Sequence, residues 1–364
     1  MYRIVVFTLL LLFGLTRGKN TLDLCKANED TYGTWNLTSS VNLREVGKYF
    51  VNGVHGHAAQ FDKMWLPTNC SYLRFTNTSL KAVAAHIIAS GKSNSKDGKL
   101  HLLFMGDSGL RGALCGIGRI LSGNEIHGPN INDICGYNEA LKPRARAPNE
   151  VNLLYSAEFD NIVITFMYIM KIEIQATGWM LEMNVHKQPY ALILNTGAWS
   201  FNEVARVRSA QFINSTENCD SPEDLRIEAE RNSPSSRAVY AECGELGFSM
   251  NVKMVYRTSH YNSRFGFNCA DAQLTPFLET KKWNIWDNSR ISKDVWKTQN
   301  HDGFHYDRIF VHNVTEHKEH IRKARELQIE SPGMLEMQLA HSLLHFLFRD
   351  TVQEFLDQGI HIPL

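Results

Sequence analysis

Apolar runs of strand length recur along the chain from about residue 99 onward, separated by stretches long enough to form helices. The runs are rich in β-branched and aromatic residues and show little alternation between apolar and polar positions. Near-continuous runs of this kind are typical of strands that are buried on both faces of a sheet. This pattern predicts strands at 100–105, 161–168, 190–194 and 252–256.

Helical periodicity marks the segments around these strands. A helix is predicted at 80–90, with Gly91 in the position that glycine favours after a helix, and another at about 108–121, directly after the first strand. A helix start is predicted at Ser221, and a last long helix at about 333–357 places leucine and phenylalanine along one stripe. Alternation of strands and helices predicts an α/β sheet that binds ligands at the carboxyl ends of its strands.

The N-terminus has the pattern of a secretory signal peptide. Arg3 precedes a twelve-residue apolar run at 4–15, and small residues follow at the two positions that a signal peptidase reads, Thr16 and Gly18. A membrane span needs roughly 20 apolar residues. We therefore expect residues 1–18 to be removed, leaving a chain without a membrane span outside the cell or in the lumen of the ER or Golgi. A short signal anchor is the alternative.

Cysteines and glycosylation motifs fit entry into the secretory pathway. The seven cysteines all follow the apolar run and include no Cys-x-x-Cys pair, so we expect up to three disulfides and one leftover thiol, with the pairing open. Cys25 and Cys70 lie outside the predicted sheet region. We expect disulfides to tie an N-terminal lobe onto the domain that holds the sheet. Five Asn-x-Ser/Thr motifs begin at Asn36, Asn69, Asn77, Asn214 and Asn313.

Composition excludes some function classes. Lys and Arg number 38, equal to the 38 Asp and Glu, and this balance argues against nucleic-acid binding, which normally shows a basic excess. A hydrophobic content of 43% is too high for a disordered chain and too mixed for a multi-span membrane protein.

A serine stands where the first predicted strand turns into a helix, in the segment Gly106-Asp107-Ser108-Gly109. A serine at such a corner exposes its hydroxyl at the carboxyl edge of the sheet, and its backbone N–H lies at a helix N-terminus, where oxyanion charge is stabilised. Arg111 follows three residues later, on the same helix face. The alternative is that Ser108 is an ordinary N-cap residue, and Asp107 is expected to brace the turn.

A second candidate motif lies near the other end of the chain, where Asp302 and His305 are separated by two residues. An Asp and a His on one turn can converge, with the His as general base and the Asp orienting it. His301 and Asp307 stand beside them, so a metal hydrolase is an alternative. The order of an early Ser and a late Asp-x-x-His favours a serine esterase.

These two motifs resemble the SGNH/GDSL esterase superfamily. Further segments make the chain similar to its PC-esterase branch, which includes the plant trichome-birefringence-like polysaccharide O-acetyltransferases. In chain order these segments are Cys25, Gly33-Thr34-Trp35, Trp65-Leu66-Pro67 with Cys70 and Leu73, Arg111 after the Gly-Asp-Ser, Asn195-Thr196-Gly197 and Arg257-Thr258. The resemblance implies a three-layer αβα domain with a parallel sheet at 98–364, preceded by a small disulfide-linked lobe at 19–97.

The chain departs from the family pattern at several positions. Ala198 replaces a His of the family, and the Leu-Pro-Gly that follows the late motif in plant members is absent. Trp199 stands where the wider superfamily carries an oxyanion-hole Asn, and this branch also has Trp there. Gly303 and Phe304 replace the Cys-Ser pair common in plant members. The catalytic interpretation survives these changes, but the plant polysaccharide substrate does not carry over.

The leading hypothesis is a serine esterase or O-acyltransferase that uses no cofactor and no metal. Ser108 attacks an acyl ester, expected to be an O-acetyl ester of a glycan, while His305 moves the proton and Asp302 orients it. The oxyanion donors are expected to be the Ser108 N–H with Arg111 and Asn195. The alternative from another class is a non-catalytic secreted glycan-binding protein on the same fold.

Overall fold

The computed structural model describes ten segments of the chain, and all structural statements below concern them. They are residues 24–35, 65–71, 73–93, 95–122, 154–169, 174–184, 187–195, 233–259, 267–293 and 334–359. The predicted signal peptide and the predicted helix start at Ser221 lie outside these residues. Within these segments, no helix combines the length and the apolarity that crossing a bilayer would require.

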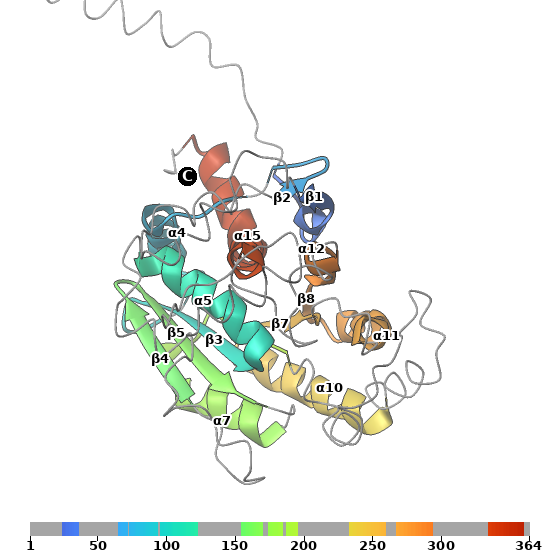
Figure 1. Cartoon of the computed structure of the whole chain (residues 1–364). Helices are drawn as coiled ribbons and strands as arrows, with labels where there is room; N and C mark the ends of the chain where they lie inside the picture. Colours follow the sequence, from blue (N-terminus) through green and yellow to red (C-terminus); the bar gives the residue numbers. More distant parts are fainter. Residues whose placement is uncertain are drawn as a thin grey trace, which may run out of the picture.

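A six-stranded sheet forms the centre of the molecule, with strand order β4-β5-β3-β6-β7-β8 (Figure 1). Every neighbouring pair is parallel except β4 and β5, which pair antiparallel. The four predicted strands are confirmed, each within two residues of its predicted ends. The strands are β3 (Leu100–Gly106), β4 (Leu154–Phe159), β5 (Ile162–Tyr168), β6 (Ala191–Leu194), β7 (Lys253–Arg257) and β8 (Asn284–Trp286).

The order of the strands reverses around β3. From β3 the chain builds β4 and β5 on one side and then crosses to β6 on the other side. In open parallel sheets, ligands bind at the carboxyl ends of the strands where the order reverses in this way. The turn that follows β3, which contains Ser108, therefore occupies the position in the fold that favours a ligand site.

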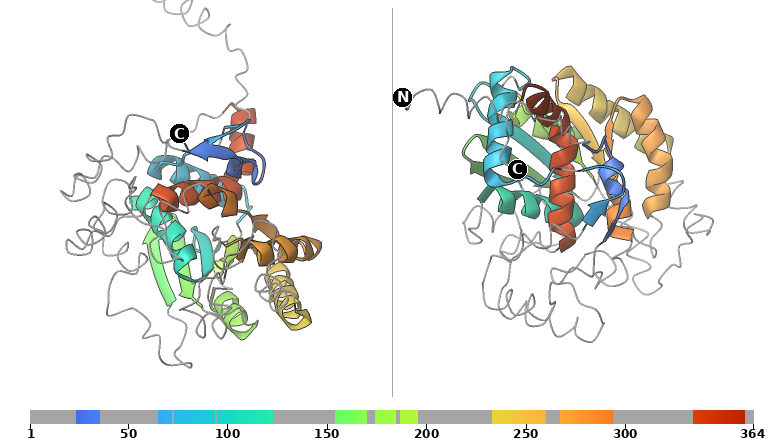
Figure 2. Two further views of the ribbon diagram at one scale, coloured as in Figure 1. Left: turned by 45° about the vertical axis from the view of Figure 1, so that its right-hand side comes forward. Right: turned by 90° about the horizontal axis from the view of Figure 1, so that it is seen from above.

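Helices cover both faces of the sheet (Figures 1 and 2). One face packs against α4 (Asn77–Ala89), α5 (Ser108–Ser122) and α15 (Met334–Asp357), and the other against α7 (Ile174–Asn184), α10 (Pro234–Ser249) and α11 (Phe267–Thr280). Alternate residues of β3 feed the two cores, with Leu102 and Phe104 on the first face and Leu103 and Met105 on the second. The predicted α/β fold with a mainly parallel sheet is confirmed.

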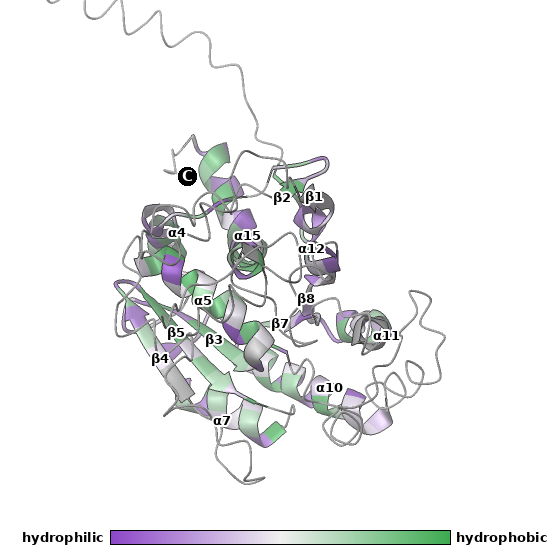
Figure 3. Cartoon of the chain, in the orientation of Figure 1, coloured by the Kyte–Doolittle hydropathy of each residue, from purple (hydrophilic) through white to green (hydrophobic). Residues whose placement is uncertain are grey.

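The hydropathy of the elements follows this layering. Strands β3 and β5 are mainly hydrophobic (Figure 3), and all seven residues of β3 are buried. The helices at 80–90, 108–121 and 333–357 are confirmed as α4, α5 and α15. Gly91, just beyond α4, has φ of 71°, the left-handed conformation expected after a helix.

Helices α5 and α15 pack closely because α5 presents glycine to α15. A Cβ atom on Gly116 would lie 2.7 Å from the Cβ of Ala340 and 2.9 Å from the carbonyl oxygen of Glu336. The second of these atoms is backbone, so the contact cannot be relieved by a side-chain rotation. A Cβ on Gly118, two residues later in the same helix, would meet only the ring of Phe159, at 4.0 Å.

These two glycines make a matched pair for a stability test. We expect Gly116→Ala to lower the free energy of unfolding by about 1–3 kcal/mol, because the added methyl forces α15 away from α5. We expect Gly118→Ala to be neutral or to stabilise by up to about 1 kcal/mol, because alanine is the better helix former. Urea unfolding midpoints measure both variants. A shift of the same sign and size in the two would contradict the close approach of the helices.

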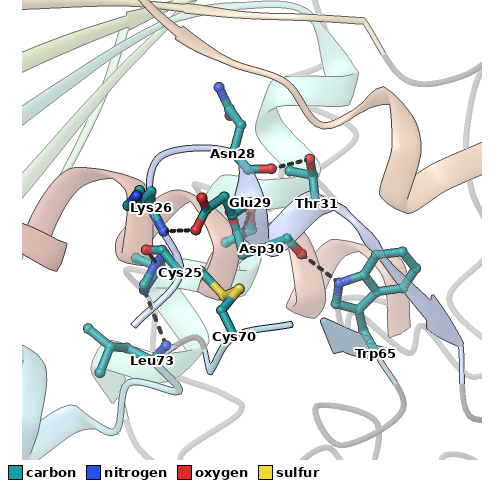
Figure 4. Close-up of a disulfide and its surroundings, with 11 residues drawn as sticks. Cys25, Lys26, Asn28, Glu29, Asp30, Thr31, Trp65, Cys70 and Leu73 are labelled. Atoms are coloured by element: carbon teal, nitrogen blue, oxygen red, sulfur yellow. Dashed lines mark hydrogen bonds between the residues drawn. A yellow bond between two sulfur atoms is a disulfide. The ribbon is translucent and has the colours of Figure 1, made fainter. Parts of the chain in front are cut away.

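The first described residues form a short 3₁₀ helix, η1 (Glu29–Thr31), and a two-stranded antiparallel sheet of β1 (Gly33–Trp35) and β2 (Trp65–Pro67). A disulfide joins Cys25 to Cys70 (Figure 4), and the Cys25 N–H donates to the Ser71 carbonyl at 2.9 Å. The sequence predicted that disulfides tie the N-terminal lobe to the sheet domain. This prediction is wrong for Cys25–Cys70: the pairing of β1 with β2 brings these cysteines together, so the bond lies within the N-terminal segment.

Hydrogen bonds to α15 attach this N-terminal segment to the rest of the molecule. The His345 imidazole accepts the Leu73 N–H through Nδ1 at 3.2 Å and donates through Nε2 to the Cys25 carbonyl at 2.8 Å. The Ser342 hydroxyl donates to Asp30 Oδ2 at 2.6 Å, and Asp30 is fully buried. We call Asp30, Ser342 and His345 the α15 clasp.

Two further cysteines have described side chains. Cys115, in α5, is also disulfide-bonded, and Cys243, in α10, is a buried free thiol. The predicted domain boundary at 97–98 falls between α4 and β3, and both elements contribute to the same hydrophobic core.

Two of the predicted glycosylation motifs are described, and they differ in their surroundings. Asn69 is exposed. Asn77 is half-buried, and its amide nitrogen donates to the Leu121 carbonyl near the end of α5. N-glycosylation would attach a sugar to this same nitrogen, and the bulk of the sugar would displace the contact.

For folded protein that has been expressed through the secretory pathway, we therefore expect a glycan at Asn69 and an unmodified Asn77. Enzymatic deglycosylation in ¹⁸O water followed by peptide mass mapping measures both sites in one sample. Equal occupancy of the two would contradict this expectation.

Candidate active site

A layer of buried polar side chains lies at the carboxyl edge of the sheet. Its members come from the turns that follow the parallel strands and from α11, and each is at most 5% exposed. Buried polar groups destabilise a fold unless they are hydrogen-bonded, so they concentrate where function or specificity requires them. The layer comprises Asp107, Asn195, Arg257, Thr258, Ser259, Asp271 and Asn288.

Asp107 shapes the turn between β3 and α5. Its Oδ1 accepts the Gly109 N–H at 2.9 Å, and its carbonyl oxygen accepts the Arg111 N–H at 3.1 Å. Asp107 is therefore the N-cap of α5, which confirms the prediction that it braces the turn. The alternative that Ser108 is the N-cap residue is wrong, because Ser108 is the first residue inside the helix. Its backbone N–H belongs to the first turn, where N–H groups have no acceptor within the helix.

Asn195 and Arg257 form a reciprocal pair beside this turn. Asn195 follows β6 and Arg257 ends β7, and the two strands are neighbours in the sheet. The Asn195 amide donates to the Arg257 carbonyl at 2.7 Å, and Arg257 Nη1 donates to Asn195 Oδ1 at 3.1 Å. The guanidinium carbon lies 5.8 Å from the centre of the Trp286 ring. Both side chains of the pair are thus held in one orientation.

The Arg257 guanidinium reaches the first turn of α5. A Cβ atom on Gly109 would lie 3.2 Å from Asp107 Oδ1, 3.4 Å from Arg257 Nη1 and 3.6 Å from Arg257 Nη2. The carboxylate and the guanidinium therefore border the space beside Gly109, and only the Asp107 oxygen would be tight against a Cβ there. A glycine directly after Ser108 lets both charged groups approach the turn between β3 and α5.

The segment after β7 is fixed by carboxylates and amides. Asp271 of α11 accepts the Tyr256 hydroxyl at 2.8 Å and the Ser259 N–H at 2.6 Å. The Thr258 hydroxyl donates to Asp287 Oδ1 at 3.0 Å and accepts the Asn288 N–H at 3.0 Å. Hydrogen bonds therefore hold the buried polar layer in place at β7 and β8 as well as at β3.

The structure brings together some of the predicted site residues. Ser108 and Asn195 follow the neighbouring strands β3 and β6, in which Met105 pairs with Leu194, and Arg111 is half-buried in the first turn of α5. Asn195 has no exposed surface, and its amide is engaged by Arg257, so its oxyanion role stays a prediction.

The other half of the predicted triad lies outside the described residues. Asp302 and His305 are not among the described residues. The same holds for Trp199 and for His301 and Asp307, which the alternative of a metal hydrolase would use. In the part of the chain that is described, no three His, Cys, Asp or Glu side chains gather as a metal site.

Sequence reasoning assigned no role to Arg257 or Asp271. Arg257 carried a signal that could have found it, because it follows an apolar strand run directly, as Asp107 and Asn195 do. The first polar residue after each parallel strand falls at the same edge of the sheet. In comparisons with family models, curated proteins and solved structures, nothing matches this chain.

Proposed function

We propose that the protein is a serine esterase or O-acyltransferase of the secretory pathway, with an SGNH-like arrangement of Ser108, His305 and Asp302. One observation carries the proposal. Ser108 is the first residue of α5, directly after the strand around which the sheet order reverses, and Asp107 performs the capping that would otherwise occupy such a serine.

The chemistry proceeds in two balanced steps. The Ser108 hydroxyl attacks the carbonyl carbon of an acyl ester, His305 takes the hydroxyl proton, and the leaving alcohol departs with that proton, which leaves an acyl-serine. Water or a sugar hydroxyl then attacks the acyl-serine and loses its proton to His305, which returns that proton to the Ser108 oxygen as it leaves, so that a free acid or a new ester is released. The first acceptor gives hydrolysis and the second gives transfer.

The N-terminus of α5 supports the negative charge that develops on the carbonyl oxygen. First-turn N–H groups and the helix dipole favour an anion at this position. The Ser108 N–H is the donor that we place there, with Arg111 half-buried on the same turn. The signal-peptide pattern and the five Asn-x-Ser/Thr motifs favour an O-acetyl ester on a glycan as substrate. Esters of lipids are the competing class of substrate.

Covalent labelling tests the nucleophile without knowledge of the substrate. We expect a fluorophosphonate probe to modify the protein in the presence of a metal chelator, and peptide mapping to place the adduct on Ser108. Ser122→Ala, at the other end of α5, is the matched control and should label like the wild type. A folded wild type that neither labels nor turns over p-nitrophenyl acetate would favour the non-catalytic binding protein, and loss of turnover with chelator would favour the metal hydrolase.

A further inference from the structure

Arg257 places a buried positive charge at an unusual position. Its side chain is 1% exposed, and its guanidinium lies beside Gly109 in the first turn of α5. An arginine cannot lose its proton inside a protein, so this charge is permanent. Taking it out of water carries a desolvation penalty that favourable contacts must offset.

The start of α5 favours a negative charge. The N-terminus of a helix is equivalent to roughly half a positive charge, so it favours anions and disfavours cations. The Asp107 carboxylate lies on the same side of Gly109 as the guanidinium and supplies a compensating negative charge. The permanent charge of Arg257 therefore lies where an anion that forms at Ser108 would benefit from it.

The guanidinium is also held rigidly. Asn195 binds it through one hydrogen bond and binds the Arg257 carbonyl through another, and the Trp286 ring lies 5.8 Å away. A fixed charge stabilises a transition state more effectively than a mobile one, because no reorganisation is needed when the reaction occurs. Since Arg257 is almost fully buried, it acts on the reacting oxygen through space.

We propose that Arg257 is an electrostatic positioning residue for acyl transfer at Ser108, orienting the first turn of α5 and adding positive potential where the oxyanion forms. This inference rests on the proposed esterase function. It assigns Asn195 the task of holding the guanidinium, in place of direct contact with the substrate.

Two substitutions separate the charge from the shape. Arg257→Lys and Arg257→Gln both lose the planar fork, but only lysine keeps a positive charge. We expect Arg257→Gln to lower kcat on p-nitrophenyl acetate by about 10- to 100-fold with KM within about twofold. We expect Arg257→Lys to retain at least about a tenth of wild-type kcat. The rate of fluorophosphonate labelling, which also passes through an anionic transition state, should fall in the same order.

The control is Arg119→Met, which removes a buried arginine near the opposite end of α5. Its kcat per folded molecule should equal that of the wild type whatever its effect on stability. If neither Arg257 variant folds, Asn195→Asp provides a second test. This variant keeps Arg257 and places a negative charge against its guanidinium. We expect its kcat to fall while its KM is unchanged.

The outcomes are distinguishable from failure of the proposed function. A wild type without turnover and without labelling removes the esterase proposal itself. If the wild type is active, two results would overturn the role of Arg257 alone. One is an equal loss of kcat in Arg257→Gln and Arg257→Lys, and the other is full kcat in Arg257→Gln. Wild-type kcat in a folded Asn195→Asp variant would also overturn this role.

Discussion

Ser108→Ala and His305→Ala are each expected to abolish nearly all ester turnover, with kcat falling by at least about 10⁴-fold. The double variant should be little worse than either single one, because residues that act as one unit in proton transfer and nucleophilic attack are strongly non-additive. Turnover of p-nitrophenyl acetate and release of acetate from an O-acetylated sugar measure the effect. Wild-type turnover by folded Ser108→Ala would end the serine-esterase proposal.

A matched pair of carboxylates identifies the acid of the triad. Asp302→Asn should lower kcat severely, yet less than the loss of Ser108 or His305, because it misorients the base without removing it. Asp107→Asn preserves an oxygen that can accept the Gly109 N–H, so the cap of α5 survives. We expect Asp107→Asn to lose far less activity than Asp302→Asn. The reverse order would make Asp107 the acid.

The elements that were predicted correctly from the sequence each carry one clear hydrophobic pattern, either a continuous apolar run or an apolar helical stripe. The strands β3, β5 and β6 are nearly all apolar, β7 has an apolar run between Lys253 and Arg257, and α15 carries a leucine stripe. In contrast, β4 mixes apolar and polar positions and lies at the edge of the sheet, and β8 has only three residues. Neither presents the continuous apolar run that marks a central strand.

The candidate site divides in the same way. The position of Ser108 follows from local sequence, because a strand, a cap and a helix meet within four residues. The contact between Asn195 and Arg257 joins residues 62 apart in the chain, and it depends on β6 and β7 being neighbours. Local patterns do not specify strand order, so the positioning role of Arg257 needed the structure.

The α15 clasp was beyond the reach of sequence for a related reason. Ser342 and Asp30 are 312 residues apart. The apolar stripe of the helix at 333–357 also gives no sign of the polar residues that hold the N-terminal segment. Burial raises the pKa of Asp30 to about 7, against the effect of its hydrogen bond from Ser342. Burial lowers the pKa of His345 to about 4, against the effect of its bond to the Cys25 carbonyl.

These two shifts act in opposite directions on stability. Between pH 3.8 and about 7 the unfolded chain has lost the Asp30 proton and the folded protein keeps it, so this group makes stability fall as pH rises. Between about pH 4 and 6.5 the unfolded chain binds a proton at His345 and the folded protein does not, so this group makes stability rise with pH. The two slopes, each about 1.4 kcal/mol per pH unit, cancel in the wild type over most of this range.

Removing either group should therefore expose the slope of the other. Relative to the wild type at the same pH, Asp30→Asn should gain about 3 kcal/mol of unfolding free energy between pH 4 and 6.5, because only the His345 term remains. His345→Gln should lose a similar amount over that window, because only the Asp30 term remains.

Both replacements preserve the hydrogen-bonding pattern, since asparagine can accept from Ser342 and glutamine can accept from Leu73 and donate to Cys25. Urea unfolding of the three proteins at half-unit pH steps measures the differences. Parallel pH profiles for the two variants would show that the clasp groups titrate alike in the folded and unfolded chains, whereas divergence of opposite sign is the result expected of a buried acid in η1 and a buried base in α15.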